Sequence, residues 1–164
     1  MLGKRGENAD FAAEHLGSSM ERVVRATSKP CFVTPAKFSA PRKVLLAYDG
    51  GDSCKKALKH ILGSSALAGL DLHVVTVAEN SPFQNEGPAD IQSLEPKIIE
   101  AGFKPHMSVL SGLAEEVISD YVTENGIDLL IMGAYGHSRI RHLIIGSTTT
   151  DLIRRCNIPV VLFR

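Results

Sequence analysis

The sequence contains no tryptophan and few other aromatic residues, and neither charge is in excess, since acidic and basic side chains balance at 18 each. A chain without a basic field is poorly suited to non-specific binding of nucleic acid or of anionic membrane surfaces. Its apolar runs are too short to span a bilayer. Lys4, Arg5 and Glu7 near its N-terminus are followed by an amphipathic stretch, whereas a signal peptide continues with an apolar core. These absences favour a cytoplasmic protein with no nucleic-acid or membrane partner.

Cysteine is also scarce. Its three residues, Cys31, Cys54 and Cys156, are odd in number, far apart, and lack the close spacing of metal ligands. This pattern favours reduced thiols, as in the cytoplasm, over a disulfide or a metal centre.

What the sequence does contain is a glycine pattern that occurs twice. The copy near the C-terminus has the spacing G-x2-G-x9-G-S and consists of Gly133, Gly136, Gly146 and Ser147. The copy near the N-terminus is one residue longer in its second interval and consists of Gly3, Gly6, Gly17 and Ser18. The matching sequence continues downstream, where Arg25 corresponds to Arg154, Pro30 to Pro159, and the segment CFVT at 31–34 to VVLF at 160–163.

The two copies differ in what precedes them. A complete α/β pattern leads up to the second copy, whereas the first copy has no such pattern in front of it. We therefore expect three parts. Residues 1–34 are the remnant of a preceding domain, with a helix over 8–27 and a strand over 31–34. Residues 35–41, with a proline at each end, are a linker, and 42–164 form one complete domain.

The complete domain alternates strand-like and helix-like segments. The apolar runs predict strands over 43–49, 71–79, 105–112, 127–133 and 159–163. The helical periodicity predicts helices over 53–69, 89–101, 113–125 and 147–156, with Pro96 causing a kink or a fresh start inside the second. This alternation predicts a doubly wound, five-stranded parallel sheet of the α/β class, in which ligands bind at the carboxyl ends of the strands.

The glycine loop after the fourth strand has the chemistry of a phosphate cradle. Glycines let backbone N–H groups approach an anion closely, and the helix that begins near Ser147 directs unpaired N–H groups and its positive dipole end towards the loop. Ser147, Thr148 and Thr149 add hydroxyl donors. An ordinary helix N-cap with loop glycines is the alternative interpretation.

Asp49 follows the first strand at the same predicted edge. Its carboxylate can accept hydrogen bonds from ribose hydroxyls or from the amino group of adenine, or it can simply cap the turn formed with Gly50 and Gly51. Neither a P-loop G-x-x-x-x-G-K-[ST] nor a strand-linked G-x-G-x-x-G occurs in the sequence. A nucleotide site here must therefore differ from the two commonest designs.

Over 42–164 the sequence resembles the ATP-binding branch of the universal stress protein family, in Asp49 after the first strand, in DGGDSCKKAL, in HVVTV, and in MGAYGHSRIRHLIIGST leading to CNIPVVLFR. The resemblance implies a Rossmann-like fold of the adenine nucleotide alpha hydrolase type with strand order 3-2-1-4-5. It also implies that Ala47, Tyr48 and Asp49 line the adenosine and that Val77 packs on the adenine. Met132 and Gly133 would lie under the ribose and first phosphates, and Gly136, Gly146, Ser147, Thr148 and Thr149 would hold the phosphate chain. The ligand would be ATP, or ADP or AMP, with or without Mg. Gly51 departs from the family, which more often has serine there.

The first copy resembles the last loop, helix and strand of the same family, in a tandem protein with a degenerate first domain. Met20 stands where the second copy has Thr149, and no residue corresponds to Asp49. We therefore expect 1–34 to bind no nucleotide. Family members pair through their final strands, so we expect a homodimer or pseudo-dimer in which Pro159–Phe163 pairs with Cys31–Thr34, with Phe32-Val33 against Val161-Leu162.

The function implied is that of an ATP-binding regulatory or stress-response protein. No nucleophile–base pair and no paired carboxylates surround the glycine loop, so at most slow ATP hydrolysis is expected. Two alternatives remain. One is a dimerising or partner-binding module that works without nucleotide. The other is a PP-loop-type ATP pyrophosphatase, for which Tyr48-Asp49-Gly50-Gly51-Asp52-Ser53 is an imperfect match.

Overall fold

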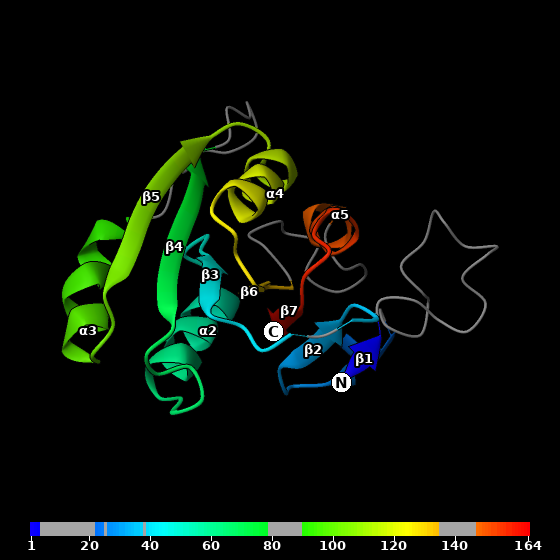
Figure 1. Ribbon diagram of the computed structural model, residues 1–164, viewed down its shortest axis with the longest axis horizontal. Coiled ribbons are helices and arrows are strands. Elements are labelled where there is room, and N and C mark those ends of the chain that lie inside the picture. The colour runs from blue at the N-terminus through cyan, green and yellow to red at the C-terminus, as the bar shows by residue number, and fades with distance from the viewer. Residues whose placement is uncertain (4–21, 25, 38, 79–89, 135–146) are drawn as a thin grey trace.

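The computed structural model describes residues 1–3, 22–24, 26–37, 39–78, 90–134 and 147–164 (Figure 1). Its strands are β1 (Leu2–Gly3), β2 (Cys31–Thr34), β3 (Lys43–Ala47), β4 (Asp71–Ala78), β5 (Pro105–Ser111), β6 (Leu129–Gly133) and β7 (Val160–Phe163). Its helices are α2 (Asp52–Leu62), the 3-10 turn η2 (Gln92–Leu94), α3 (Glu95–Glu100), α4 (Ala114–Glu124) and α5 (Ser147–Arg155).

All the described strands belong to one sheet, in the order β1-β2-β7-β6-β3-β4-β5. The five strands β3 to β7 are parallel to one another and stand in the predicted order, with β3 at the centre. The predicted doubly wound α/β fold is thus confirmed. The sheet continues past these five strands, because β2 and β1 extend it beyond β7.

The extension follows the pairing expected from the sequence. Strand β2 runs antiparallel to β7, with Phe32 opposite Val161 at the centre of the register. Strand β1 then runs parallel to β2. The final strand therefore has a neighbour on each side, and its outer edge is covered by the same chain.

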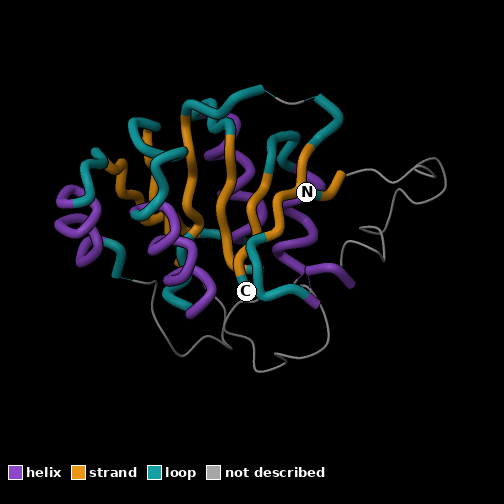
Figure 2. The backbone as a smooth tube through the Cα atoms, turned by 90° about the horizontal axis from the view of Figure 1, so that it is seen from below, coloured by secondary structure: helices purple, strands orange, loops and turns teal. Residues whose placement is uncertain are grey.

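Helices cover both faces of the sheet, as Figure 2 shows. On one face α4 and α5 pack through Ile118, Val122, Leu152 and Ile153 onto a core that also contains Val24 and Val33. On the other face α2 and α3 pack through Ala57, Leu58, Ile61 and Ile98. Val24, Cys31 and Val33 from the N-terminal region therefore belong to the same hydrophobic core as α4 and α5.

Two predicted helices differ from the observed ones. The helix predicted over 53–69 ends at Leu62, since Gly63 forms its C-cap and the chain then turns through Ser64 and Ser65. The helix predicted over 89–101 is replaced by η2 followed by α3, and Pro96 lies in the first turn of α3, where its missing N–H costs nothing. Proline thus begins a helix here and does not kink one.

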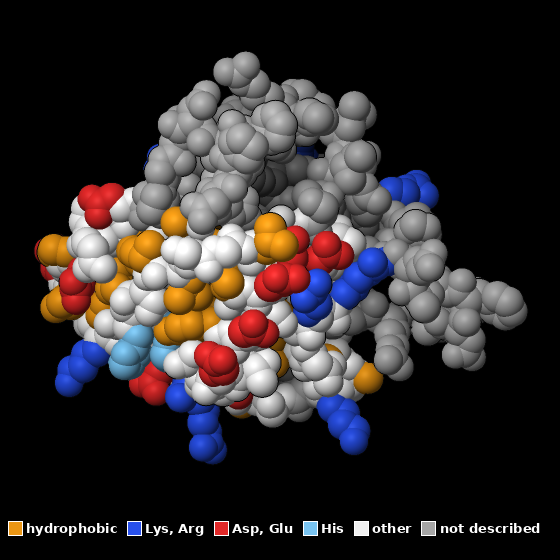
Figure 3. All heavy atoms as spheres, turned by 90° about the horizontal axis from the view of Figure 1, so that it is seen from above, with side chains coloured by type: hydrophobic (Ala, Val, Ile, Leu, Met, Phe, Trp, Pro, Cys, Tyr) orange, Lys and Arg blue, Asp and Glu red, His pale blue; other side chains and the backbone are white. Residues whose placement is uncertain are grey.

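The helix predicted over 8–27 falls mostly outside the described residues. Within that range, residues 22–24 and 26 are described as helical. All three cysteines are buried and carry free thiols. In the part of the chain that the structure describes, no helix is long and apolar enough to cross a membrane. Acidic, basic and hydrophobic side chains are interspersed on the face seen in Figure 3, consistent with the balanced charge.

Candidate functional site

The candidate site lies at the carboxyl ends of the central strands. In the register of the sheet, Ala47 at the end of β3 stands between Val75 of β4 and Met132 of β6. The main-chain N–H of Tyr48 donates to the carbonyl of Val75 at 2.8 Å and prolongs this pairing by one residue. The structure therefore brings the predicted residues at 47–49, 77 and 132–133 to one edge of the sheet.

Asp49 is exposed at this edge, and its carboxylate is held by the loop that follows it. The main-chain N–H of Gly51 donates to Asp49 Oδ1 at 2.8 Å. Gly50, between them, has φ of 79°, a left-handed conformation that favours glycine. The turn is therefore the Asp-capped one that the sequence left open as an alternative.

Helix α2 starts directly beneath the ends of β3 and β6. The thiol of Cys54 in its first turn donates to the carbonyl of Ala47 at 3.3 Å. A Cβ atom placed on Gly133, at the end of β6, would lie 3.1 Å from Cβ of Ser53 and 3.3 Å from Sγ of Cys54. Glycine at 133 thus fits the close approach of the helix, and a Cβ atom there would be in tight contact with the first turn of α2.

Burial shapes the ionisation of two groups at this edge. Burial of Cys54, with the negative charge of Asp49 nearby, raises the pKa of its thiol to about 12. Cys54 is therefore a neutral hydrogen-bond donor and not a thiolate nucleophile at neutral pH. Burial, followed by the charges of Cys54 and Asp49, also raises the pKa of the Tyr48 hydroxyl. Val77 is partly buried and packs against the core under α4 and α5.

The N-terminus of α5 reaches the same edge. Thr149 in its first turn is 4% exposed, and its hydroxyl donates to the carbonyl of Ala134 at 3.5 Å. This contact ties the start of α5 to the end of β6, where the Ala134 N–H also donates to the carbonyl of Phe163 at 2.7 Å. Thr148 is half-buried beside it. Gly136 and Gly146 lie outside the described residues, and of Ser147 only the backbone is described.

Sequence reasoning did not identify two residues of this edge, Cys54 and Ser53. Cys54 was interpreted only as one of three reduced thiols, and the sequence gives no direct sign that it lies against Gly133. Its position did carry one signal: it follows Asp49 by five residues, in the first turn of the predicted helix, and that turn must face the strand ends in a doubly wound fold.

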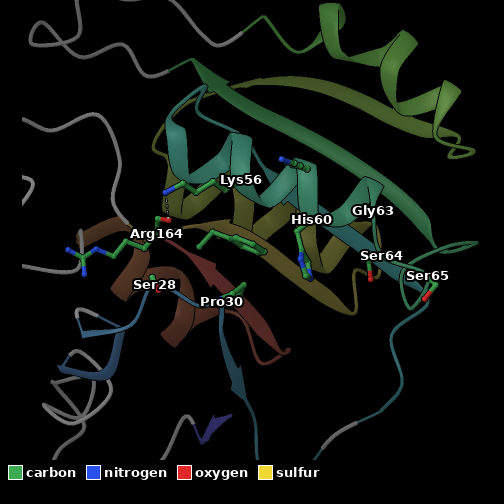
Figure 4. Close-up of a pocket in the computed structure, with 10 residues that line it drawn as sticks. Ser28, Pro30, Lys56, His60, Gly63, Ser64, Ser65 and Arg164 are labelled. Carbon is green, nitrogen blue, oxygen red and sulfur yellow. Dashed lines mark hydrogen bonds between the residues drawn. The ribbon is translucent and has the colours of Figure 1, made fainter.

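A separate groove of about 670 Å³ lies between α2 and the region around Ser28 and Pro30 (Figure 4). The amine of Lys56 there donates to the main-chain oxygen of Arg164 at 3.0 Å. Figure 4 shows the Arg164 side chain pointing away from His60, so the basic groups do not converge. The groove contains none of the predicted site residues.

A pair of stacked imidazoles lies elsewhere, under α4. His73 of β4 is 6% exposed, and its ring centre is 4.5 Å from that of His106 on the neighbouring strand β5. Nδ1 of His73 shares a hydrogen bond of 2.8 Å with the Tyr121 hydroxyl. Burial, and then the charges of His106 and Lys43, lower the pKa of His73 against an opposing effect of Asp71. In the described residues, no three His, Cys, Asp or Glu side chains group as metal ligands.

The fold and this edge together define a doubly wound α/β domain, the class in which ligands bind where strand ends and helix starts meet. The chain belongs to the universal stress protein family, whose sequence model matches residues 41–164.

Relatives of known name agree with this assignment. The universal stress protein Slr1230 of Synechocystis sp. is 53% identical over 167 residues, an alignment that covers 100% of this chain and 57% of that protein. The crystal structure of a universal stress protein from Archaeoglobus fulgidus matches with a TM-score of 0.69 at 25% identity, over 87% of this chain and 52% of the other. A universal stress protein in complex with cAMP matches with a TM-score of 0.59 at 23% identity, over 77% of this chain and 98% of the other. The chain thus spans little more than half the length of the first two.

Proposed function

We propose that the chain binds an adenine nucleotide, with ATP as the preferred ligand, at the edge formed by the ends of β3 and β6 and the start of α5, and that it acts as a regulatory protein of the stress response. Gly136, Gly146 and Ser147 would complete the site as the sequence predicts. A family relative that was solved with cAMP supports a ligand that contains adenine. No efficient catalysis is proposed.

The observation that carries the proposal is the close packing of Gly133 at the carboxyl end of β6. The first turn of α2 approaches this residue so closely that a Cβ atom would meet Ser53 at 3.1 Å. Asp49 follows the neighbouring strand β3, and Thr149 ties the start of α5 to Ala134, the residue after Gly133. A carboxylate acceptor and a helix N-terminus on two sides of a glycine are the groups that a nucleoside phosphate needs.

The same residues fit the parts of the ligand. Asp49 would accept from the ribose or from the adenine amino group, while Ala47, Tyr48, Val77 and Met132 would supply the apolar surface. Thr148 and the first N–H groups of α5 would donate to phosphate oxygens. Thr149 donates to Ala134 in this structure, so we propose that it positions the start of α5 in addition to any contact with phosphate. Magnesium, where bound, would neutralise phosphate charge.

We further propose that residues 1–34 are a second, non-binding copy of the β6-to-β7 region, joined by the linker 35–41 to the complete domain at 42–164. The antiparallel pairing of β2 with β7 supports a pseudo-dimer within one chain. A homodimer through β7 would need the edge that β2 occupies. A cytoplasmic location belongs to the same proposal and is supported by the three buried free thiols.

The proposal is tested on purified protein by acid extraction and chromatography of bound nucleotide, followed by titration with ATP, ADP and AMP. We expect co-purified adenine nucleotide or direct binding, and loss of both in the Gly133→Val, Ser147→Ala double variant. Full occupancy in that folded variant would reject this site. A wild-type chain that binds none of the three nucleotides would instead favour a module that works through protein partners alone.

A further inference from the structure

The groove between α2 and the region around Ser28 and Pro30 is built by both copies of the repeated segment. One wall comes from α2 and from the turn that follows it. The other wall comes from Ser28 and Pro30, which precede β2, and from Phe163 and Arg164 at the end of β7 (Figure 4). Its volume of about 670 Å³ lies within the range of about 300–1,000 Å³ that is typical of binding pockets. The groove is therefore large enough to hold a ligand.

The charge of this groove is one-sided. Lys56, Lys59, His60 and Arg164 line it, and none of the described residues that line it is an aspartate or a glutamate. The chain as a whole is balanced at 18 acidic and 18 basic residues. The groove therefore concentrates positive charge on a molecule without net charge, and it favours an anionic ligand. Its remaining polar side chains are hydroxyl groups, those of Ser28, Ser64 and Ser65.

Helix α2 carries this charge without full compensation. Lys56 and Lys59 stand three residues apart, so they are neighbours on the helix surface, where like charges weakly repel. Asp52 is the only acidic residue of α2, and it lies four residues before Lys56 but seven before Lys59. Within the described part of the chain, no carboxylate forms an ion pair with Lys59. Lys59 is exposed and thus available to an outside anion.

The positive groups are spread along the groove and do not meet at one point. The amine of Lys56 donates to the main-chain oxygen of Arg164 at 3.0 Å, which uses one of its three hydrogens. The side chain of Arg164 points away from His60 (Figure 4). A single phosphate ion needs donors that converge on it, whereas a chain of carboxylates can meet separate cations in turn. The spacing therefore favours an extended ligand with several negative charges.

The dimensions and the apolar part of the groove fit a peptide. From Lys56 to the C-cap Gly63, α2 rises about 10 Å, which an extended peptide spans in three or four residues at about 3.3 Å each. The ring of Phe163 is 5.4 Å from that of His60, and with Pro30 it supplies apolar surface beneath the charged groups. The methylene groups of glutamate side chains can pack on such a surface while their carboxylates reach the lysines.

We infer that this groove binds an acidic peptide, an extended segment of a partner protein with about four aspartate or glutamate residues. The inference goes beyond the proposed nucleotide binding, and none of the residues proposed to hold the nucleotide lines the groove. Recognition would rest on the cations of α2 on one wall and on the hydroxyl of Ser28 on the other. The ligand would therefore contact both the complete domain and the N-terminal region.

The test is a titration of the full chain with a dansyl-labelled peptide of six glutamates, followed by fluorescence anisotropy at about 0.15 M salt. We expect saturable binding to the wild type. Lys59→Glu replaces a cation by a like charge, and we expect it to weaken binding about tenfold or more. Ser28→Glu places a carboxylate on the opposite wall, and we expect a loss of similar size. A ligand that met α2 alone would not respond to Ser28→Glu.

Lys97→Glu is the matched control, because it makes the same charge change at an exposed lysine of α3 that does not line the groove. We expect the affinity of this variant for the peptide to stay within about twofold of the wild type. A peptide of six lysines should not bind. Thermal midpoints show that the variants fold, and we expect both groove variants to keep the ATP affinity of the wild type.

Three results would overturn the inference. The first is a wild type without saturable binding of the glutamate peptide. The second is an equal loss in Lys59→Glu, Ser28→Glu and Lys97→Glu, which would show attraction by net charge alone. The third is displacement of the peptide by inorganic phosphate at equal concentration, which would make the groove a small-anion site. A chain that binds the peptide but no ATP would overturn only the proposed function.

Discussion

The two copies of the glycine pattern share one strand register and differ in their surroundings. In the second copy Met132 pairs with Leu162 and Gly133 with Phe163. In the first copy the corresponding pairs are Leu2 with Val33 and Gly3 with Thr34. The register is therefore the same in both copies, although the first strand of the N-terminal pair is only two residues long.

The two copies differ in the residues and strands that surround their first glycine. Gly133 lies between strands β3 and β7, against the first turn of α2 and near Asp49. Gly3 is exposed, and within the described residues its strand β1 pairs with β2 alone. The comparison shows that main-chain pairing needs only two strands. The arrangement around Gly133 also needs a third strand and the helix that follows that strand.

The largest expected effect comes from making the same pair of substitutions in each copy and comparing the affinities for ATP. Overpacking at Gly133 costs about 1–3 kcal/mol, and with the loss of the Ser147 hydroxyl we expect Gly133→Val, Ser147→Ala to weaken ATP binding roughly a hundredfold or more. Gly3→Val, Ser18→Ala changes the corresponding positions of the first copy, and we expect it to leave ATP affinity at the wild-type value. Isothermal titration of both variants decides this. A comparable loss in the first-copy variant would show that residues 1–34 take part in binding.

The second prediction concerns what the first copy contributes to the stability of the fold. Val33 is fully buried opposite Val160 in the β2–β7 pair. We expect Val33→Ala to lower the free energy of unfolding by about 2 kcal/mol, through lost burial and an unfilled cavity, and to leave nucleotide affinity unchanged. Thermal unfolding and titration measure the two effects separately.

The control for that substitution is Val109→Ala on β5, at the opposite end of the sheet, where the side chain is 52% exposed. We expect a change within about 0.5 kcal/mol there. If the two variants unfolded at the same temperature, the N-terminal copy would contribute nothing to the stability of the fold.

The smallest expected effect is on the pH dependence of stability and concerns the buried His73 of β4. The pKa of His73 is lowered in the folded state, so folding favours its neutral form. Stability from this group is fully present above the unfolded pKa near 6.5 and is lost as the pH falls from there towards the folded pKa. We expect thermal midpoints between pH 7 and pH 5 to fall less steeply in His73→Gln. His60→Gln, at an exposed histidine of α2, should retain the wild-type slope.

Much of the fold could be predicted from the sequence, and the reasons are physical. Apolar runs such as the one at 43–47 are buried on both faces of the sheet, and this pattern leaves few alternatives to a parallel central strand. The pairing of Phe32-Val33 with the region around Val161-Leu162 was implied by the resemblance to the family. Helix ends were less accessible, since Pro96 is compatible with a kink or with a start, and only packing decides between them.

The candidate site divides in the same way. Asp49 and Gly133 could be placed near each other from the sequence because each stands at the carboxyl end of a strand, and the ends of parallel strands lie together. The contacts of Cys54 with Ala47 and of Gly51 with Asp49 could not, because they depend on how closely α2 approaches the sheet. How closely the helix approaches is set by the side-chain packing of the whole helix. The sequence indicates only that the first turn of α2 faces the strand ends. This approach is also the part of the site that distinguishes the two copies.

The seam between β2 and β7 has a consequence for association. Its register places Cys31 opposite Leu162 and Val33 opposite Val160, so exchanging the two copies maps the seam onto itself. An edge that accepts β2 in this way is also suited to accept β7 of another molecule. Because a short linker tethers β2, it competes at an effective concentration on the order of millimolar. Within one chain β2 therefore already occupies the edge of β7, and a second molecule that paired there would first have to displace it.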